Sequence, residues 1–114
     1  MAKYNSKKSK KRTVGKGKIY VTATFNNTIV TITDDKGDVL DWVSCGAMGF
    51  KGTRKSTPFA ATTTMKEAVN RLNRLGIKDL EVYLKGPGSG RDAAIRVLRG
   101  LRNVNINMVS DITP

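Results

Sequence analysis

Two runs of alternating apolar residues, separated by a pair of asparagines, constrain the fold most strongly. From Ile19 to Phe25 every second residue is apolar, with Tyr and Thr between them, which is the period of a half-buried strand. A second run follows from Thr28 to Ile32. Asn26-Asn27 lies between the runs, and both residues tolerate the positive φ of a tight hairpin turn. The sequence therefore predicts an antiparallel hairpin whose domain starts near Lys18.

The next segment extends this hairpin into a meander. Asp34-Asp35-Lys36-Gly37 has the composition of a turn. A third strand is predicted from Val39 to Cys45, with Leu40 and Trp42 on one face and Val43 on the other. Three antiparallel strands are expected.

A helix is predicted after a glycine-rich segment. Thr57 suits the N-cap and Pro58 the first helical position, and Gly76 suits the position just past the end. The spacing between these signals is filled by apolar residues at steps of three and four, which form one face. This predicted face consists of Ala61, Met65, Ala68, Leu72 and Leu75.

The remaining residues predict a strand, a helix and a final strand. Alternation at Leu80, Val82 and Leu84 indicates the fourth strand. A second helix is predicted from Arg91 to Arg102, burying Ala94, Val97, Leu98 and Leu101. A fifth strand is predicted from Val104 to Val109. The order β-β-β-α-β-α-β predicts a layered α/β domain, residues 18–114, with a mixed five-stranded sheet.

Charge and composition limit the possible functions. The 114 residues suit one domain, and the formal net charge of +12 with a pI near 10.2 attracts polyanions and opposes self-association. Nucleic acid is the expected partner, with an anionic membrane surface as the rival. No apolar run approaches the roughly 20 residues of a spanning helix, so no membrane role is expected. The chain contains no histidine and one cysteine, Cys45, which fits a reduced cytoplasmic setting and removes most nucleophile and zinc chemistry. We expect no enzyme activity, no metal and no cofactor.

The first 17 residues form a basic arm. The arm has no acidic residue and only one core-type aliphatic, Val14, so it is expected to be disordered when free and to order on RNA. The cations of the arm and the start of the first strand are predicted RNA contacts: Lys3, Lys7, Lys8, Lys10, Lys11, Arg12, Lys16 and Lys18.

The glycine-rich segment 46–57 is the first predicted RNA-binding loop. Glycines let backbone N–H groups approach a phosphate, and the segment leads into a helix N-terminus. Lys51, Arg54 and Lys55 can neutralise phosphates, and Phe50 can stack on an unpaired base. A flexible surface loop without function is the alternative, while Met48 is expected to pack.

The segment from Lys85 to Ala93 is the second predicted loop. Gly88, Gly90 and Ala93 also satisfy a dinucleotide-binding pattern, with Asp111 about 20 residues further on. Three antiparallel strands precede this pattern, however, where a nucleotide-binding fold would normally start with it. Lys85 and Arg91 flank the turn, which suits a polyphosphate chain better than a single cofactor. Ser89 and Asp92 in addition resemble a helix capping box.

Two further charged groups are weaker candidates. Basic stripes are predicted on the first helix (Lys66, Arg71, Arg74) and on the second (Arg96, Arg99, Arg102), either solvated or in contact with RNA or acidic protein. Four aspartates near the second turn (Asp34, Asp35, Asp38, Asp41) do not have the spacing of a calcium loop, and metal binding is not expected.

Several motifs together resemble a known family. Asn26-Asn27-Thr28, Gly49-Phe50-Lys51-Gly52 with Arg54-Lys55 and Thr57-Pro58, Lys85-Gly86-Pro87-Gly88 with Gly90-Arg91, Ala94-Ile95-Arg96 and Asp111-Ile112-Thr113-Pro114 are similar to motifs of ribosomal protein eleven of the small subunit, in its bacterial form. The resemblance covers residues 17–114. Family members usually continue past this Thr-Pro with a basic tail, and the contacts made through that tail are not carried over.

The resemblance implies a fold, a location and a set of contacts. The fold implied is ribonuclease-H-like without that enzyme's active site. The location implied is the platform of the small ribosomal subunit, where the protein binds rRNA beside other small-subunit proteins and near mRNA. The chain is not expected to form a homo-oligomer. Beyond the arm, the RNA contacts expected are Asn26, Asn27, Gly49, Phe50, Lys51, Gly52, Arg54, Lys55, Lys85, Gly86, Gly88, Ser89, Gly90 and Arg91.

Overall fold

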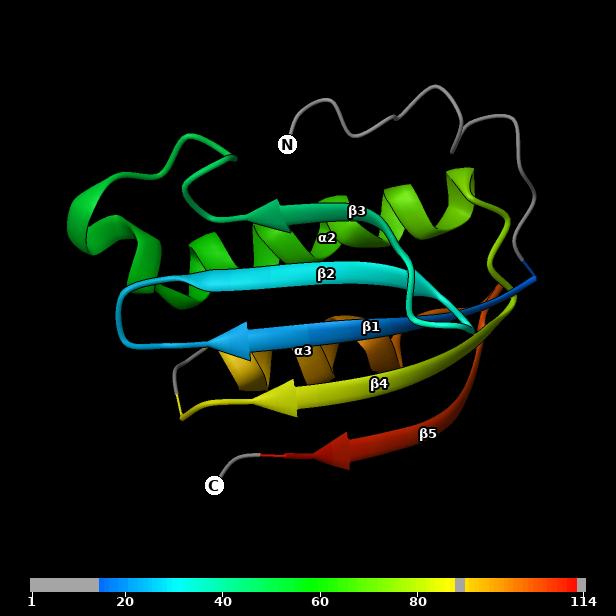
Figure 1. The fold of residues 1–114 in the computed structure, drawn as a ribbon. Helices are drawn as coiled ribbons and strands as arrows, with labels where there is room; N and C mark the ends of the chain where they lie inside the picture. The colour runs from blue at the N-terminus through cyan, green and yellow to red at the C-terminus, as the bar shows by residue number, and fades with distance from the viewer. Residues whose placement is uncertain (1–14, 88–89, 113–114) are drawn as a thin grey trace.

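One mixed sheet of five strands organises the molecule (Figure 1). The computed structural model describes residues 15–87 and 90–112. The strands are β1 (Lys16–Ala23), β2 (Thr28–Asp34), β3 (Val39–Ser44), β4 (Asp79–Lys85) and β5 (Asn105–Asp111), in the order β3-β2-β1-β4-β5. The first three strands are antiparallel, whereas β4 is parallel to β1 and β5 is parallel to β4. The predicted meander and mixed sheet are confirmed.

Both α-helices cover the same face of this sheet. The helix α2 (Pro58–Arg74) packs on β2 and β3, α3 (Gly90–Arg99) packs on β1, and the two helices contact each other. A short 3-10 helix, η1 (Gly52–Ser56), precedes α2. In Figure 1 both helices lie on one side of the strands, and none of the described helices or strands covers the other side of the sheet. The fold is therefore a two-layer α/β domain with one open sheet face.

The core lies between the helices and the covered sheet face. The alternation predicted for β1 and β4 is confirmed, because Ile19, Val21, Leu80 and Val82 are buried while the residues between them are half-buried. The apolar stripe predicted for the first helix packs against β2 and β3, and every member of it is at least 95% buried. Burial of each large aliphatic side chain contributes roughly 1.5–3 kcal/mol, which makes this layer the main source of stability.

The ends of α2 are formed by the residues that predicted them. The side chain of Thr57 accepts a hydrogen bond from Ala60 N at 3.1 Å, and Pro58 occupies the first turn. At the other end Gly76 has a φ of 74°, and Ile77 N donates to Leu72 O at 3.2 Å. This closing pattern satisfies carbonyls that the helix leaves unpaired.

The first strand differs from the prediction at both of its ends. It begins at Lys16, so the last two residues of the predicted arm lie in the sheet. It ends at Ala23, and Phe25 is not part of the alternation but lies in the turn, 74% exposed. The turn takes four residues from the chain, and this places the phenyl ring in solvent.

The third strand contains a β-bulge that alternation alone does not predict. Ile32 pairs with Asp41 and Thr33 pairs with Val39, so Leu40 is an extra residue in β3. Leu40 consequently lies on the same covered face as Val43, and both are buried. The predicted pairing of Leu40 with Trp42 on one face is wrong, because the bulge shifts the alternation by one residue.

The second helix is shorter than predicted. It ends at Arg99, just before Gly100, where glycine favours termination. Ala94 and Leu98 are buried as expected, whereas Val97 and Leu101 are only partly buried against the core. The last strand begins at Asn105 and extends to Asp111, two residues further than predicted.

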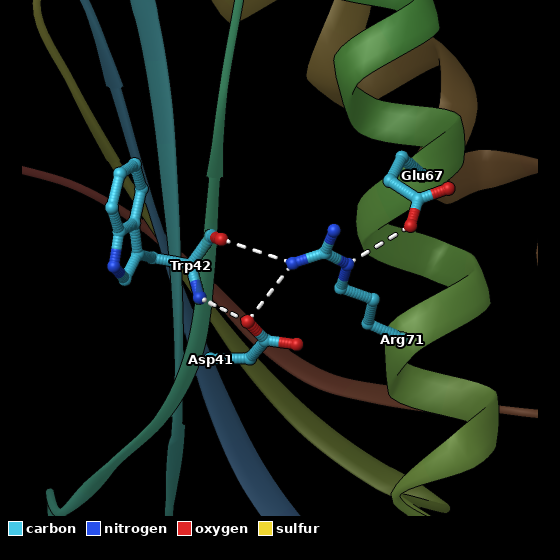
Figure 2. A network of polar contacts seen from close by, with 4 residues as sticks. All are labelled: Asp41, Trp42, Glu67 and Arg71. Atoms are coloured by element: carbon cyan, nitrogen blue, oxygen red, sulfur yellow. Dashed lines mark hydrogen bonds and ion pairs between the residues drawn. The ribbon is translucent and has the colours of Figure 1, made fainter. Parts of the chain in front are cut away.

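A polar network joins α2 to the edge strand β3 (Figure 2). Arg71 donates from Nε to Glu67 Oε2 at 2.9 Å, and from Nη1 to Asp41 Oδ1 at 2.9 Å and to the carbonyl of Trp42 at 3.2 Å. Arg71 was predicted as part of a basic surface stripe, but its charge is used here to attach the helix to the sheet.

Candidate nucleic-acid interface

Three connections meet at one end of the molecule, which we call the loop end. They are the β1–β2 turn (residues 24–27), the segment from β3 to α2 (residues 45–57) and the described start of the connection from β4 to α3 (residues 86–87). Figure 1 shows all three on the left, where α2 and α3 also begin. The N-terminus of a helix carries partial positive charge and unpaired N–H groups, so this end suits anions.

The β1–β2 turn is built around Thr24. The Oγ1 atom of Thr24 accepts hydrogen bonds from Asn26 N at 3.2 Å and Asn27 N at 3.1 Å, while Thr24 N donates to Asn27 O at 2.9 Å. No non-glycine residue in the described ranges has a positive φ, so the conformation predicted for the two asparagines is wrong. The chain reverses direction through a four-residue loop held by the threonine side chain, and not through two residues in the left-handed conformation.

Thr28 joins this turn to both neighbouring loops. Its carbonyl accepts from Cys45 N at 3.1 Å, at the start of the first glycine-rich segment. On the other side, a Cβ added to Gly90 would overlap with the Thr28 side chain, and one added to Gly86 would overlap with the carbonyl of Ala23. Both glycines therefore permit close packing of the β4–α3 connection on the hairpin. The RNA contact predicted for each remains a prediction.

The segment after β3 is folded rather than extended. Ala47 N donates to Ser44 Oγ at 3.0 Å, and Phe50 N donates to Cys45 O at 3.1 Å. Gly49 and Gly52 have φ of 97° and 57°, and an added Cβ would meet no atom within 4 Å at either, so the backbone angle alone requires glycine. The flexible loop considered as an alternative is thus replaced by turns and η1.

Cations predicted from the sequence lie on this folded segment and on the neighbouring connection. Lys51, Arg54 and Lys85 are exposed, and Lys55 is half-buried with its stem beside Gly46. Exposed cations near helix N-termini can neutralise several phosphates together. Gly88 and Ser89 lie outside the described residues.

Two exposed aromatic rings at the loop end were not anticipated. Phe59 is 72% exposed and lies edge-on to Phe50, with ring centroids 6.0 Å apart and an interplanar angle of 85°. Phe25 is exposed at the tip of the β1–β2 turn. Phe59 could have been found from the sequence, because it lies off the apolar stripe of α2, whereas Phe25 was hidden by the strand alternation.

Arg91, at the start of α3, forms an ion pair with Asp111 at the end of β5. A strand–loop–helix–strand unit with parallel β4 and β5 surrounds the predicted dinucleotide pattern. The Asp111 carboxylate, which completes that pattern, instead pairs with Arg91. This pairing fixes the guanidinium at the rim of the second loop.

Other predicted cations lie elsewhere. Lys16 and Lys18 are at the opposite end of β1 from the loop end. The arm residues Lys3, Lys7, Lys8, Lys10, Lys11 and Arg12 lie outside the described residues. On the helices, Lys66, Arg74, Arg96 and Arg99 are exposed, whereas Arg102, predicted as part of the second stripe, is exposed but lies after the end of α3.

Two of the four aspartates near the second turn, Asp34 and Asp41, have local partners. Asp34 Oδ1 accepts from Lys36 N and Asp38 N, both at 2.9 Å, and Asp41 pairs with Arg71. Hydrogen bonding to Arg71 lowers the pKa of Glu67; burial acts to lower the pKa of Arg71, but its two acidic partners outweigh this and raise it. Within residues 15–87 and 90–112, no three His, Cys, Asp or Glu side chains are placed to hold a metal ion.

The open sheet face carries a row of aromatic and hydroxyl side chains. Pairing aligns Trp42, Thr31, Tyr20, Tyr83 and Ser110 across the five strands. The rings of Tyr20 and Tyr83 stack at 4.8 Å, and the hydrogen bond from Tyr83 to Glu81 raises the pKa of this phenol. In the described part of the chain, no helix is long and apolar enough to cross a membrane.

Comparison with known proteins identifies relatives over nearly the whole chain. The family model described as ribosomal protein S11 matches residues 17–114. Small ribosomal subunit protein uS11 of Borreliella burgdorferi (strain ZS7) is 53% identical over 110 residues, covering 96% of this chain and 84% of the relative. The uS11 protein of Rhodopirellula baltica is 50% identical over 114 residues, covering 100% of this chain and 89% of the relative. The uS11c protein of Mesostigma viride is 52% identical over 104 residues, covering 91% of this chain and 79% of the relative.

Identity of about half over this span is far above the level at which the fold and broad role are shared, and it agrees with the resemblance noted from the motifs. It also removes the dinucleotide-enzyme alternative, since the family is non-enzymatic. The chain therefore belongs to the ribosomal protein S11 family, whose members are structural components of the small ribosomal subunit.

Proposed function

We propose that this chain binds the platform region of small-subunit rRNA through its loop end and so supports the mRNA-binding region during translation. The observation that carries the proposal is the convergence at one end of both glycine-rich segments, the β1–β2 turn and two helix N-termini. Lys51, Arg54, Lys55, Lys85 and Arg91 supply the positive charge there.

The packing of the loop end supports recognition of a folded RNA. Thr28 ties the β1–β2 turn to both loops, so the cations are held at set positions on a rigid sheet. A preorganised set of charges recognises the shape of a backbone, and exposed phenyl rings can stack on unpaired bases. A protein that bound any polyanion through its net charge would not need cations held at defined positions.

A salt titration of binding to a platform rRNA fragment, beside a scrambled RNA of equal length, tests the proposal. We expect the platform RNA to be preferred by about a hundredfold, about 3 kcal/mol, at every salt concentration. The triple variant Lys51→Ala/Arg54→Ala/Lys55→Ala should weaken binding and reduce the slope of log affinity against log salt by about 2–3. Equal binding of both RNAs would leave only a nonspecific charge effect.

A matched triple variant controls for net charge. Lys36, Arg74 and Lys78 are exposed and lie at the opposite end of the molecule from the loops. Lys36→Ala/Arg74→Ala/Lys78→Ala removes the same three charges, and we expect a smaller loss of affinity and preserved preference for the platform RNA. Equal losses in the two triple variants would contradict the placement of the interface.

We further propose that the basic arm, residues 1–17, contacts rRNA beyond the domain, that neighbouring small-subunit proteins and the mRNA path lie close by, and that the chain works as a single copy in cytoplasmic ribosomes. The net charge of +12 supports RNA partnership over self-association. Removing residues 1–14 should reduce the slope of log affinity against log salt without changing the melting temperature of the domain, because Gly15, whose carbonyl accepts hydrogen bonds from Lys78 N and Asp79 N, is kept.

The ribonuclease-H-like fold is also a proposal. It is supported by the strand order β3-β2-β1-β4-β5, with an antiparallel meander followed by two parallel strands. Superposition of residues 16–111 on structures of that fold would test it.

A further inference from the structure

The two edge strands of the sheet differ in whether side chains bind their outward backbone groups. β3 forms one edge and β5 the other. An edge strand presents backbone N–H and C=O groups that can pair with an additional extended chain. The difference between the two edges indicates which of them is available.

The β3 edge is capped by side chains. Asp41 Oδ1 accepts from Trp42 N at 2.8 Å, and Arg71 donates to Trp42 O at 3.2 Å. Figure 2 shows both contacts on the same stretch of β3. An incoming strand would have to displace a carboxylate and a guanidinium that also bind each other, so this edge is closed.

The β5 edge presents backbone groups at Val109. Ile112 N donates to Leu84 O on β4 at 2.8 Å. Successive residues of an extended strand point their backbone groups to opposite sides, so Val109 points its N–H and C=O away from β4. No strand lies beyond β5 in the part of the chain that the structure describes, and Val109 is 57% exposed.

An apolar pocket adjoins this edge. It lies between β5 and α3, has a volume of about 290 Å³, and is lined by Val82, Ile95, Leu98, Ile106, Val109 and Arg99. All of these residues except the arginine are aliphatic. A strand edge beside a pocket under a helix is the arrangement by which domains bind extended peptides, with backbone bonds to the strand and a side chain in the pocket.

We propose that the β5 edge is a docking site for an extended segment of a partner protein, which adds as a sixth strand and places an aliphatic side chain and, two residues later on the same face, a carboxylate at the pocket. Arg99, which lines this pocket, provides the complementary charge. The inference does not depend on the RNA contacts proposed above.

Other occupants fit the site less well. A second copy of this chain would bring two molecules of net charge +12 together at a surface that already carries arginines. An RNA base would find no aromatic ring among the residues that line the pocket. A segment that carries both an aliphatic side chain and a carboxylate fits the apolar lining of the pocket and the arginine at its rim.

Fluorescence anisotropy with defined peptides tests the proposal on the full chain. The probe is a labelled ten-residue peptide of alternating Thr and Val in which two successive Val positions near the centre are Leu and Glu, so that both side chains lie on one face. Two further versions carry an N-methyl group on one or the other of two successive residues. Since only one of two successive N–H groups faces β5, we expect one version to bind about tenfold more weakly and the other to bind like the parent. Equal behaviour of the two methylated peptides would overturn strand addition.

Protein variants test the two halves of the site. Val109→Pro removes an outward N–H without removing a bond to β4, and should weaken peptide binding about tenfold while circular dichroism stays unchanged. In case this variant does not fold, Arg99→Glu provides an independent test: it should weaken binding of this peptide and strengthen binding of a version with Lys in place of its Glu. Arg74→Glu, the same change at the far end of α2, should do neither.

The remaining outcomes contradict the proposal. If Arg99→Glu and Arg74→Glu weaken the peptide equally, the attraction is bulk charge alone. A dimer in light scattering that Val109→Pro dissociates would assign the edge to a second copy. Loss of platform RNA binding in Val109→Pro, with no peptide binding by the parent chain, would assign the edge to RNA.

Discussion

Arg71 on α2 and Asp41 on β3 form an ion pair of 2.9 Å that joins the helix layer to the edge of the sheet (Figure 2). The two residues are 30 positions apart in the chain. The same guanidinium binds Glu67 and the Trp42 carbonyl, so one side chain holds three acceptors at the point where β3 has no outer neighbour.

Replacing this arginine should destabilise the domain moderately. Arg71→Ala removes all three contacts, and since the pair is partly exposed we expect a loss of about 1–2 kcal/mol in the free energy of unfolding. Lys66→Ala, an exposed cation on the same helix, should change it by less than about 0.5 kcal/mol. Urea denaturation of both variants measures this, and equal effects would mean that the network contributes nothing specific.

Acid should weaken the same network. Hydrogen bonding to Arg71 holds the pKa of Glu67 below its ordinary value, so the folded state favours the ionised carboxylate. The stabilisation is present above the unfolded pKa of this group and is lost as pH falls through the lowered folded pKa. Glu67→Gln should therefore be less stable than the parent at pH 7, and the difference should shrink in acid. A constant difference across pH would contradict the role of the charge.

Two glycines with nearly the same backbone angle should respond differently to alanine. Gly49 and Gly86 have φ of 97° and 98°, but only Gly86 lies against a backbone carbonyl, that of Ala23. Gly49→Ala should cost about 1–2 kcal/mol for the angle alone, while Gly86→Ala should cost about 1–3 kcal/mol more because a clash is added. Thermal or urea unfolding measures both, and equal costs would show that the hairpin moves away freely.

The thiol of Cys45 should be inert in the folded protein. It is fully buried and accepts a hydrogen bond from Thr64 Oγ1 at 3.2 Å. A chromogenic disulfide reagent should therefore react only through opening of the domain, and should react at once in denaturant. Fast labelling of the native chain would contradict the burial of β3's end against α2.

Exposed phenyl rings at the loop end should affect RNA binding more than stability. Phe25→Ala and Phe59→Ala remove rings that are 74% and 72% exposed, so unfolding should change little. Affinity for the platform rRNA fragment should fall by about 1–3 kcal/mol for each base stack lost. Trp42→Ala, which removes an exposed ring from the open sheet face, is the matched control and should leave affinity unchanged.

The local elements could be predicted because they depend on residues close in the chain. Thr57, Pro58 and Gly76 mark the ends of α2 by capping chemistry that needs no tertiary partner, and alternation at Ile19 and Leu80 marks β1 and β4. The cations and glycines of the two loops were equally visible. What could not be predicted depends on pairing between strands: the bulge at Leu40 and the loss of Phe25 from β1 are set by register and turn length.

The sequence by itself determined the order of elements, the family, the positive charge and the two glycine-rich loops, because each is a property of composition or of neighbours a few residues apart. Only the tertiary structure decided that Thr28 brings these loops together, that Lys16 and Lys18 lie away from them, and that Arg71 binds one sheet edge while β5 has no outer neighbour among the described residues. The physical reason is that ion pairs and strand edges join residues far apart in the chain, whose distances are fixed only when the sheet is assembled.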